Sequence, residues 1–157
     1  MKQFVTCRID DRPYGIDIGF IREINKNFLL TPVERCPDYI SGLVNIRGQI
    51  VTVLDVGVRM GLPVRKNSGQ LYNIVLKGPA ELVASGILGD VSLELAEDDK
   101  VGFLVDSVGD VVEIDERQIE AVPANVAESQ AAFLSGVVRD GAELFAILDV
   151  PKVLAGK

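Results

Sequence analysis

The fold is decided by the stretch YISGLVNIRGQIVTVLDV, residues 39–56, because it recurs as FLSGVVRDGAELFAILDV, residues 133–150. The two segments are 18 residues long and align without a gap at an offset of 94. Both run from an aromatic and an aliphatic residue through Ser-Gly and a polar turn to Leu-Asp-Val. Short hairpins resemble one another by chance, but the shared order of Ser-Gly and Leu-Asp-Val favours an internal repeat.

Each copy predicts a β-hairpin. In the first copy, residues 42–46 and 49–54 are rich in Val, Ile and Leu and are separated by Arg47-Gly48. Glycine adopts the positive φ that a tight hairpin turn requires, and Asp140-Gly141 supplies the same signal in the second copy. Strands that are apolar at nearly every position are typical of sheets covered on both faces.

A weaker match extends the repeat upstream of both hairpins. Gly15-Ile16-Asp17-Ile18 leads into Ile21-Arg22-Glu23-Ile24, and Phe103-Leu104-Val105-Asp106 leads into Val111-Val112-Glu113-Ile114. Each half therefore holds a strand that carries an aspartate, a short link, a second strand and the hairpin. We expect two related β units in tandem, with a loop at residues 61–70 between them.

The remaining pattern consists of short strands with close turn signals. We expect further strands over residues 2–9, 13–18, 22–30, 71–77, 101–105 and 108–114, and short helical segments over 56–62, 128–132 and 150–154. About ten short strands indicate an all-β fold of small barrels or a sandwich. Residues 78–100, with several glycines and an acidic run, interrupt two strands that would otherwise pair. We interpret them as an extended hairpin insertion.

Asp55 and Asp149 close the two hairpins, and two interpretations of them are open. Aspartate is a favoured N-cap, because its carboxylate accepts hydrogen bonds from the free amides of a helical first turn. A pair of aspartates from two halves also resembles the dyad of pepsin-like hydrolases, which share one proton. That dyad needs Asp-Thr/Ser-Gly, whereas the sequence has Asp55-Val56-Gly57 and Asp149-Val150-Pro151. Capping is the favoured interpretation.

Composition excludes several classes of protein. The chain has 157 residues, 48% of them hydrophobic, which is enough for one domain with its own core. A net charge of −7 argues against nucleic-acid binding, which needs clustered Lys and Arg. No apolar stretch reaches the roughly 18 residues of a membrane span, and the first residues enter a strand pattern without a signal peptide. We expect a cytoplasmic protein with no membrane insertion.

The sequence also lacks the usual chemistry of an active site. It contains no histidine, which removes His-dependent triads and most zinc sites. No GxxxxGK[ST] or GxGxxG motif is present, so no phosphate-binding loop is predicted. Cys7 and Cys36 lie 29 residues apart, and free thiols are favoured over a disulfide. We therefore predict no enzyme activity, no metal and no cofactor.

The motifs together resemble the CheW family, the scaffold proteins of bacterial chemosensory arrays. The resemblance is carried by Tyr14-Gly15-Ile16-Asp17-Ile18, Glu23-Ile24, Ile40-Ser41-Gly42, Asn45-Ile46-Arg47-Gly48 and Leu54-Asp55, and it covers roughly residues 3–155. It implies one CheW-like domain made of two SH3-like five-stranded β-barrels packed together.

The resemblance implies partners as well. Proteins of this family bridge methyl-accepting chemotaxis receptors to the histidine kinase CheA, whose regulatory domain has the same fold. Adaptors of other chemosensory pathways, such as pilus motility or second-messenger control, use the same contacts, and the sequence does not separate the two. A hydrolase built on the two aspartates is a remote alternative.

Two sets of binding residues follow from the resemblance. The receptor-binding groove maps onto Ile21, Glu23, Arg47, Gly102, Val108 and Val111, and the kinase-binding surface onto Leu30, Ile40, Ser41 and Gly42. An arginine in a hairpin turn is usually only solvated. Opposite Glu23, however, Arg47 can form a bidentate ion pair that fixes the groove, and the resemblance favours the pair.

Overall fold

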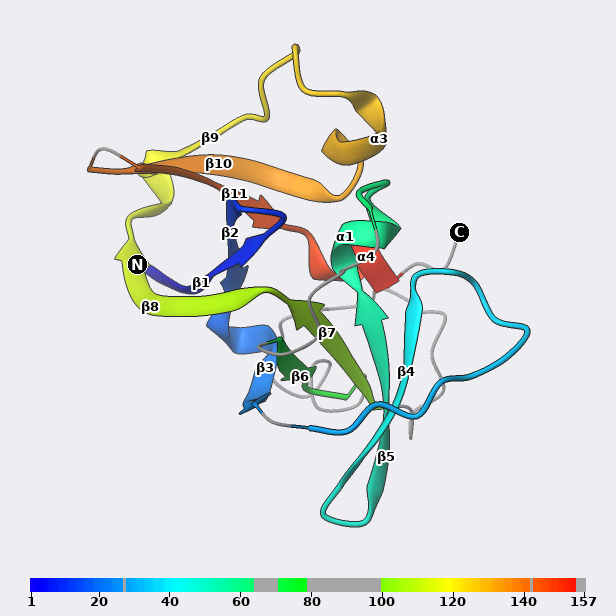
Figure 1. The fold of residues 1–157 in the computed structure, drawn as a ribbon. Helices are drawn as coiled ribbons and strands as arrows, with labels where there is room; N and C mark the ends of the chain where they lie inside the picture. The colour runs from blue at the N-terminus through cyan, green and yellow to red at the C-terminus, as the bar shows by residue number, and fades with distance from the viewer. Residues whose placement is uncertain (27, 64–70, 79–99, 142, 155–157) are drawn as a thin grey trace.

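The computed structural model describes residues 1–26, 28–63, 71–78, 100–141 and 143–154, and its regular structure is mostly sheet (Figure 1). We call the first sheet the terminal sheet, because it contains β1 and β11, the first and last strands of the described chain. Its order is β8-β1-β2-β11-β10-β9, formed by β1 (Lys2–Ile9), β2 (Arg12–Asp17), β8 (Ser107–Ile114), β9 (Ile119–Glu120), β10 (Leu134–Asp140) and β11 (Glu143–Leu148).

The second sheet, the central sheet, has the order β3-β6-β7-β5-β4. Its strands are β3 (Ile21–Lys26), β4 (Ile40–Ile46), β5 (Gln49–Asp55), β6 (Tyr72–Leu76) and β7 (Val101–Val105). Short helices join or follow the strands: η1 (Ile18–Phe20), α1 (Val56–Arg59), η3 (Glu116–Gln118), α3 (Glu128–Ala131) and α4 (Val150–Leu154). The predicted all-β fold of two small barrels is confirmed, and the terminal sheet carries β9 as a sixth strand.

The two units of the repeat exchange strands. The first unit comprises β1 to β5, and the second comprises β6, β7, β8, β10 and β11. The terminal sheet pairs β1 and β2 with strands of the second unit, whereas the central sheet pairs β6 and β7 with strands of the first. The units are therefore in tandem along the sequence, as predicted, but each sheet contains strands from both.

The register of the exchanged strands repeats. Gly15 of β2 lies opposite Ile147 of β11, and Gly102 of β7 lies opposite Val53 of β5. Both pairings are parallel, in sheets that are otherwise antiparallel. Both hairpins also carry an irregularity at the same repeat position, between residues 40 and 42 and between residues 134 and 136. The duplication seen in the sequence is thus preserved at the level of hydrogen-bond register.

Both aspartates cap helices, as predicted. The Asp55 carboxylate accepts a hydrogen bond from the amide of Val58 at 3.2 Å, and that of Asp149 accepts one from the amide of Lys152 at 3.3 Å. Helix α1 ends at Arg59, three residues before the expected end. This explains the two aspartates of the repeat without a catalytic dyad.

Three clusters of apolar side chains form the core. One lies within the central sheet and contains Val44, Val51, Val53 and Leu104, and one lies within the terminal sheet around Phe4, Ile114, Val138, Phe145 and Ile147. The largest takes residues from both sheets and from α1 and α4, including Ile9, Ile16, Val56, Met60, Ile74, Phe103 and Val150. We call it the shared core, because it joins the two barrels.

Arg59, at the end of α1, lies where the two units meet. Its guanidinium carbon is 4.8 Å from the ring centre of Tyr39 and 4.8 Å from that of Phe133. Tyr39 and Phe133 occupy equivalent positions of the repeat, so one cation contacts the equivalent aromatic ring of each unit. Arg59 Nε also donates to the carbonyl oxygen of Val153 in α4 at 3.2 Å.

Several expectations differ from the structure or lie outside it. Strand β3 ends at Lys26 rather than at residue 30, because its partner β6 begins at Tyr72, opposite Lys26. Asp140 ends β10, so the second turn begins at Gly141. Helices η1 and η3 and strand β9 were not predicted. The expected insertion at residues 78–100 falls almost wholly outside the described residues, as does most of the expected loop at 61–70.

Cys7 and Cys36 are both free, as predicted. Burial raises the pKa of the Cys7 thiol to about 12, so this side chain stays a protonated core residue at neutral pH. Over the described part of the chain, no helix has the length and apolar character needed to cross a membrane.

Asp149→Ala should lower the free energy of unfolding by about 1 kcal/mol, because the first turn of α4 loses its acceptor. Asp149→Asn retains a side-chain oxygen at the same place and should keep most of this stability. Urea denaturation followed by circular dichroism measures both variants. An asparagine variant as unstable as the alanine variant would contradict the capping role.

Candidate functional site

The centre of the candidate site is an ion pair between β3 and the turn after β4. Strand β3 alternates, so that Ile21, Glu23 and Asn25 are half-buried while the residues between them are exposed. Arg47 Nη2 contacts Glu23 Oε2. Because β3 and β4 are the two edges of the central sheet, this pair joins the edges. The predicted ion pair of Glu23 with Arg47 is present, but its expected bidentate geometry is wrong: Arg47 contacts one carboxylate oxygen, and Asn25 donates to the other.

The backbone of Arg47 is in an unusual conformation. Its φ is +50°, and that of Gly48 is +85°, which are the positive angles of a type I′ hairpin turn. A large side chain at positive φ costs of the order of 1 kcal/mol, and such residues cluster at functional sites. The Asn45 side chain stabilises the turn by accepting a hydrogen bond from the Gly48 amide at 2.9 Å. Arg47 is thus held in place at the tip of the hairpin.

Glu23 is held by two donors. Asn25 Nδ2 donates to Glu23 Oε1 at 3.0 Å, and Arg47 donates to the other carboxylate oxygen. These hydrogen bonds, that of Asn25 first and that of Arg47 second, lower the pKa of the Glu23 carboxyl group. Glu23 is therefore ionised at neutral pH. Sequence analysis missed Asn25, although its spacing of two residues from Glu23 in a strand was the available signal.

Gly102 lies in the same cross-strand row as Glu23 but is buried. The row runs from Glu23 through Val75, Gly102 and Val53 to Gly42. A Cβ atom at Gly102 would lie 2.0 Å from Oδ1 of Asn73, so the position needs glycine. Gly102 is thus a buried packing position within the sheet.

The two predicted valines lie on β8, the edge strand of the terminal sheet. Val111 is 50% exposed, whereas Val108 is half-buried and packs against the shared core, as Ile21 does. Val108 also lines a cleft of about 310 Å³ between β1, β2, β8 and β11. Ile21 and Val108 are therefore brought to the same core from the edge strands of the two sheets.

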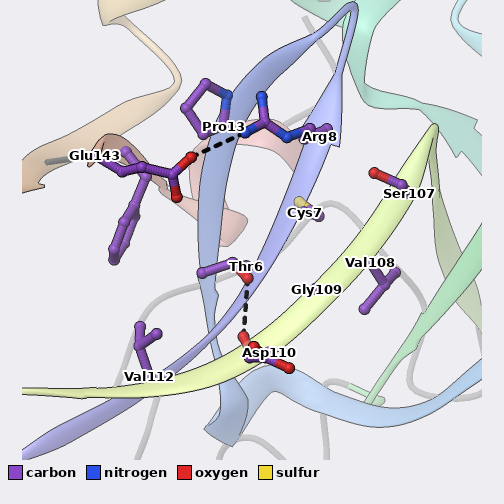
Figure 2. A pocket seen from close by; sticks show the side chains of 11 residues that line it. Thr6, Cys7, Arg8, Pro13, Ser107, Val108, Gly109, Asp110, Val112 and Glu143 are labelled. Atoms are coloured by element: carbon purple, nitrogen blue, oxygen red, sulfur yellow. Dashed lines mark hydrogen bonds and ion pairs between the residues drawn. The ribbon is translucent and has the colours of Figure 1, made fainter. Parts of the chain in front are cut away.

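The cleft beside Val108 is closed by side chains that already have partners (Figure 2). Thr6 Oγ1 donates to the Asp110 carbonyl oxygen at 2.8 Å, where β1 and β8 change register. Arg8 Nη2 contacts Glu143 Oε1 at 3.0 Å at the rim. Thr6 and Arg8 thus already have partners, and Val108 and Val112 line the cleft beside them.

The predicted kinase-binding residues gather around β4. Gly42 is buried, and a Cβ atom there would lie 2.6 Å from the carbonyl oxygen of Thr31 and 3.5 Å from Leu30. Thr31 and Leu43 exchange backbone hydrogen bonds of 2.8 Å, which hold Leu30 against this strand. Ile40 packs against the shared core, and Ser41 is half-buried. Leu30 and Gly42 are thus neighbours, with Ile40 and Ser41 at the start of the same strand.

An apolar surface that sequence analysis did not identify lies next to these residues. A cavity of about 390 Å³ is lined by Asn25, Lys26, Phe28, Leu29, Thr31, Val44, Asn45 and Ile46. Leu29 is 85% exposed. A leucine so exposed beside an apolar cavity is typical of a protein-docking surface. The apolar run Phe28-Leu29-Leu30 was the available signal, but the sequence pattern predicts it as the end of a strand.

No metal centre is seen in the described ranges, because no three His, Cys, Asp or Glu side chains there are grouped to hold an ion. The charged residues that come together pair with one another at the surface. Two barrels that share strands, with an ion pair across the edges of one of them, define a double-barrel docking protein.

The chain belongs to the family of proteins with a CheW-like domain, whose family model matches residues 3–157. It is 27% identical to the chemotaxis protein CheW of Treponema pallidum over 156 residues, covering 99% of this chain and 83% of that protein. It is 23% identical to CheW of Thermotoga maritima, covering 98% of this chain and 89% of that protein. The family resemblance is confirmed.

A solved structure agrees in fold. The scaffolding protein TtCheW from Thermoanaerobacter tengcongensis superimposes with a TM-score of 0.77 at 26% sequence identity, covering 99% of this chain and 95% of that protein. The two barrels that exchange strands therefore have a fold that is also found in a solved scaffold protein.

Gly102→Ala should destabilise the protein by about 1–3 kcal/mol, because the new methyl group overlaps the Asn73 side chain. In the double variant Gly102→Ala/Asn73→Ala the overlap is gone, so the loss should be smaller than the sum of the two single losses. Denaturant unfolding of all four proteins measures this coupling. Simple additivity would show that Asn73 is not what keeps position 102 a glycine.

Proposed function

We propose that this protein couples methyl-accepting chemotaxis receptors to the histidine kinase CheA, using the groove of Glu23 and Arg47 for the receptor and the surface of Leu30 and Ser41 for the kinase. The chain is a chemotaxis adaptor by its family. The proposal concerns its two partners and the surface that each one contacts. The observation that carries it is the ion pair of Glu23 with Arg47, held on a strained turn.

The receptor surface combines a fixed charge pair with apolar side chains. Ile21 and Val108 present their exposed parts beside the shared core, and Val111 is open to solvent. Docking surfaces gain most of their affinity from a few apolar anchors, while a charged rim sets orientation. This arrangement suits the amphipathic face of a receptor helix, with Arg47 and Glu23 as the orienting charges.

The kinase surface is different in character. Ser41 is half-buried, and Leu29 is exposed beside Leu30, so uncharged side chains lie next to β4. We propose that a barrel of the CheA regulatory domain packs here, strand against strand. In this proposal Ser41, near the start of β4, contacts the kinase and Arg47, after the end of β4, contacts the receptor, so both partners bind at once and the effective concentration of kinase at the receptor rises.

In this proposal the protein works in the cytoplasm as a scaffold and carries out no reaction of its own. Because the shared core takes side chains from both sheets, we expect residues 3–155 to unfold as a single domain. A single domain transmits the position of one partner to the other without a hinge.

Glu23→Lys and Arg47→Glu should each weaken binding of a receptor-tip fragment at least about tenfold, because each places two like charges in the groove. Neither should change the melting temperature much, since an exposed ion pair contributes about 0–1 kcal/mol. Isothermal titration calorimetry measures the affinity. Arg117→Glu is the matched control, because Arg117 pairs with Asp115 in the other half of the protein. Unchanged affinity in both groove variants would disprove the receptor surface.

Ser41→Arg should weaken binding of the CheA regulatory domain about tenfold and leave receptor binding unchanged, because a long charged side chain would hold the barrels apart. Separate titrations with the kinase domain and with the receptor fragment measure the two affinities. If kinase binding persists in this variant, the kinase surface lies elsewhere.

A further inference from the structure

We propose that Asn25 is a positioning residue for the receptor groove, which orients the Glu23 carboxylate so that Arg47 and the receptor meet it in one fixed geometry. This inference rests on the proposed function of the Glu23 groove. It adds a residue that neither the family motifs nor the predicted site includes.

The two oxygens of the Glu23 carboxylate have different partners. Oε1 accepts from Asn25 Nδ2 at 3.0 Å, and Oε2 contacts Arg47 Nη2. Asn25 belongs to the same strand as Glu23, whereas Arg47 comes from the turn between β4 and β5. With only one of these donors the carboxylate rotates about its last side-chain bond, and with both it is fixed.

Strand geometry places Asn25 for this role. Residues two apart in a strand point to the same face, so Asn25 lies next to Glu23 on the half-buried side of β3. The Glu23 side chain is only 23% exposed, compared with 73% for Arg47. The bond from Asn25 is therefore the better shielded from water of the two.

A buried asparagine lies behind Asn25. Asn73 of β6 is the direct cross-strand partner of Asn25 and is fully buried. Its two side-chain polar atoms, and Oδ1 of Asn25, form no hydrogen bond within the described part of the chain. Burying such groups without a hydrogen bond costs about 1–3 kcal/mol of folding stability each, so two facing asparagines destabilise the interior of the sheet.

This polar pair links the predicted groove residues. Asn73 occupies the space that Gly102 leaves open, Asn25 lies opposite Asn73, and Glu23 accepts the hydrogen bond of Asn25. Gly102 thus makes room for Asn73, the cross-strand neighbour of Asn25. The Asn25 amide nitrogen faces Glu23, since it donates to Oε1 of that carboxylate.

The charge state of Glu23 reports on this arrangement. Asn25 is the largest cause of the lowered pKa of Glu23, followed by Arg47, with a smaller contribution from Arg22 of the same strand. The facing residue of β6 is Val75, which carries no charge. Since the folded pKa lies below the ordinary value, Glu23 stays ionised until the pH falls through that lowered pKa. Loss of Asn25 moves this transition to higher pH.

The test compares Asn25→Thr with Asn25→Val. Both residues are β-branched and favour strands, and they differ only in that threonine has a hydroxyl that donates. The valine variant should raise the pKa of Glu23, measured by carboxyl NMR titration, and should weaken binding of a receptor-tip fragment about five- to tenfold. The threonine variant should recover part of both. Ile24→Ala, on the opposite face of β3, is the control and should leave the pKa of Glu23 unchanged.

Each result decides a separate question. Equal pKa values and equal affinities in the threonine and valine variants would overturn the positioning role. A raised pKa in the valine variant with full receptor affinity would also overturn it, since orientation of Glu23 would then not matter for binding. If the wild-type protein itself does not bind the receptor fragment, the proposed function fails, while the NMR titration still measures the Asn25 contact.

Discussion

The parallel pairings of β2 with β11 and of β7 with β5 are the constraint on which the other features depend. Each joins a strand of one repeat unit to a hairpin of the other, so neither sheet can form from one unit alone. The exchange also brings β1, β2, β6 and β7 together around the shared core. A single folded body follows, with its edge strands β3 and β8 supplied by opposite units. These edge strands carry Ile21, Glu23, Val108 and Val111 of the proposed receptor surface.

Local features could be predicted from the sequence because their causes are local. The hairpin of residues 40–55 follows from its apolar runs and from Arg47-Gly48, and the aspartate caps follow from position alone. Which unit pairs with which is a matter of long-range packing, and the repeat alone does not encode it. The same holds for the length of β3. This strand ends at Lys26, opposite the first residue of its partner β6, and not where its own apolar pattern ends.

The residues of the candidate site show the same contrast between features with local causes and features set by long-range packing. Glu23 and Arg47 were identified through the family motif, and their contact needed coordinates for confirmation. Gly102 looked like a surface residue in the motif, yet it is buried against Asn73. Asn25 was overlooked because an asparagine in a strand has no motif of its own. Sequence reasoning thus names residues that touch a partner more readily than those that hold them in place.

Arg59 lies at a position where the two halves of the repeat differ in sequence. The position 94 residues later is Val153, whose carbonyl oxygen Arg59 contacts, so this arginine lies close to the pseudo-twofold axis relating the units. Two arginines there would place like charges side by side, and two valines would leave Tyr39 and Phe133 without the cation that both rings contact. The two halves therefore differ at this point, and a single arginine serves the aromatic ring of each half.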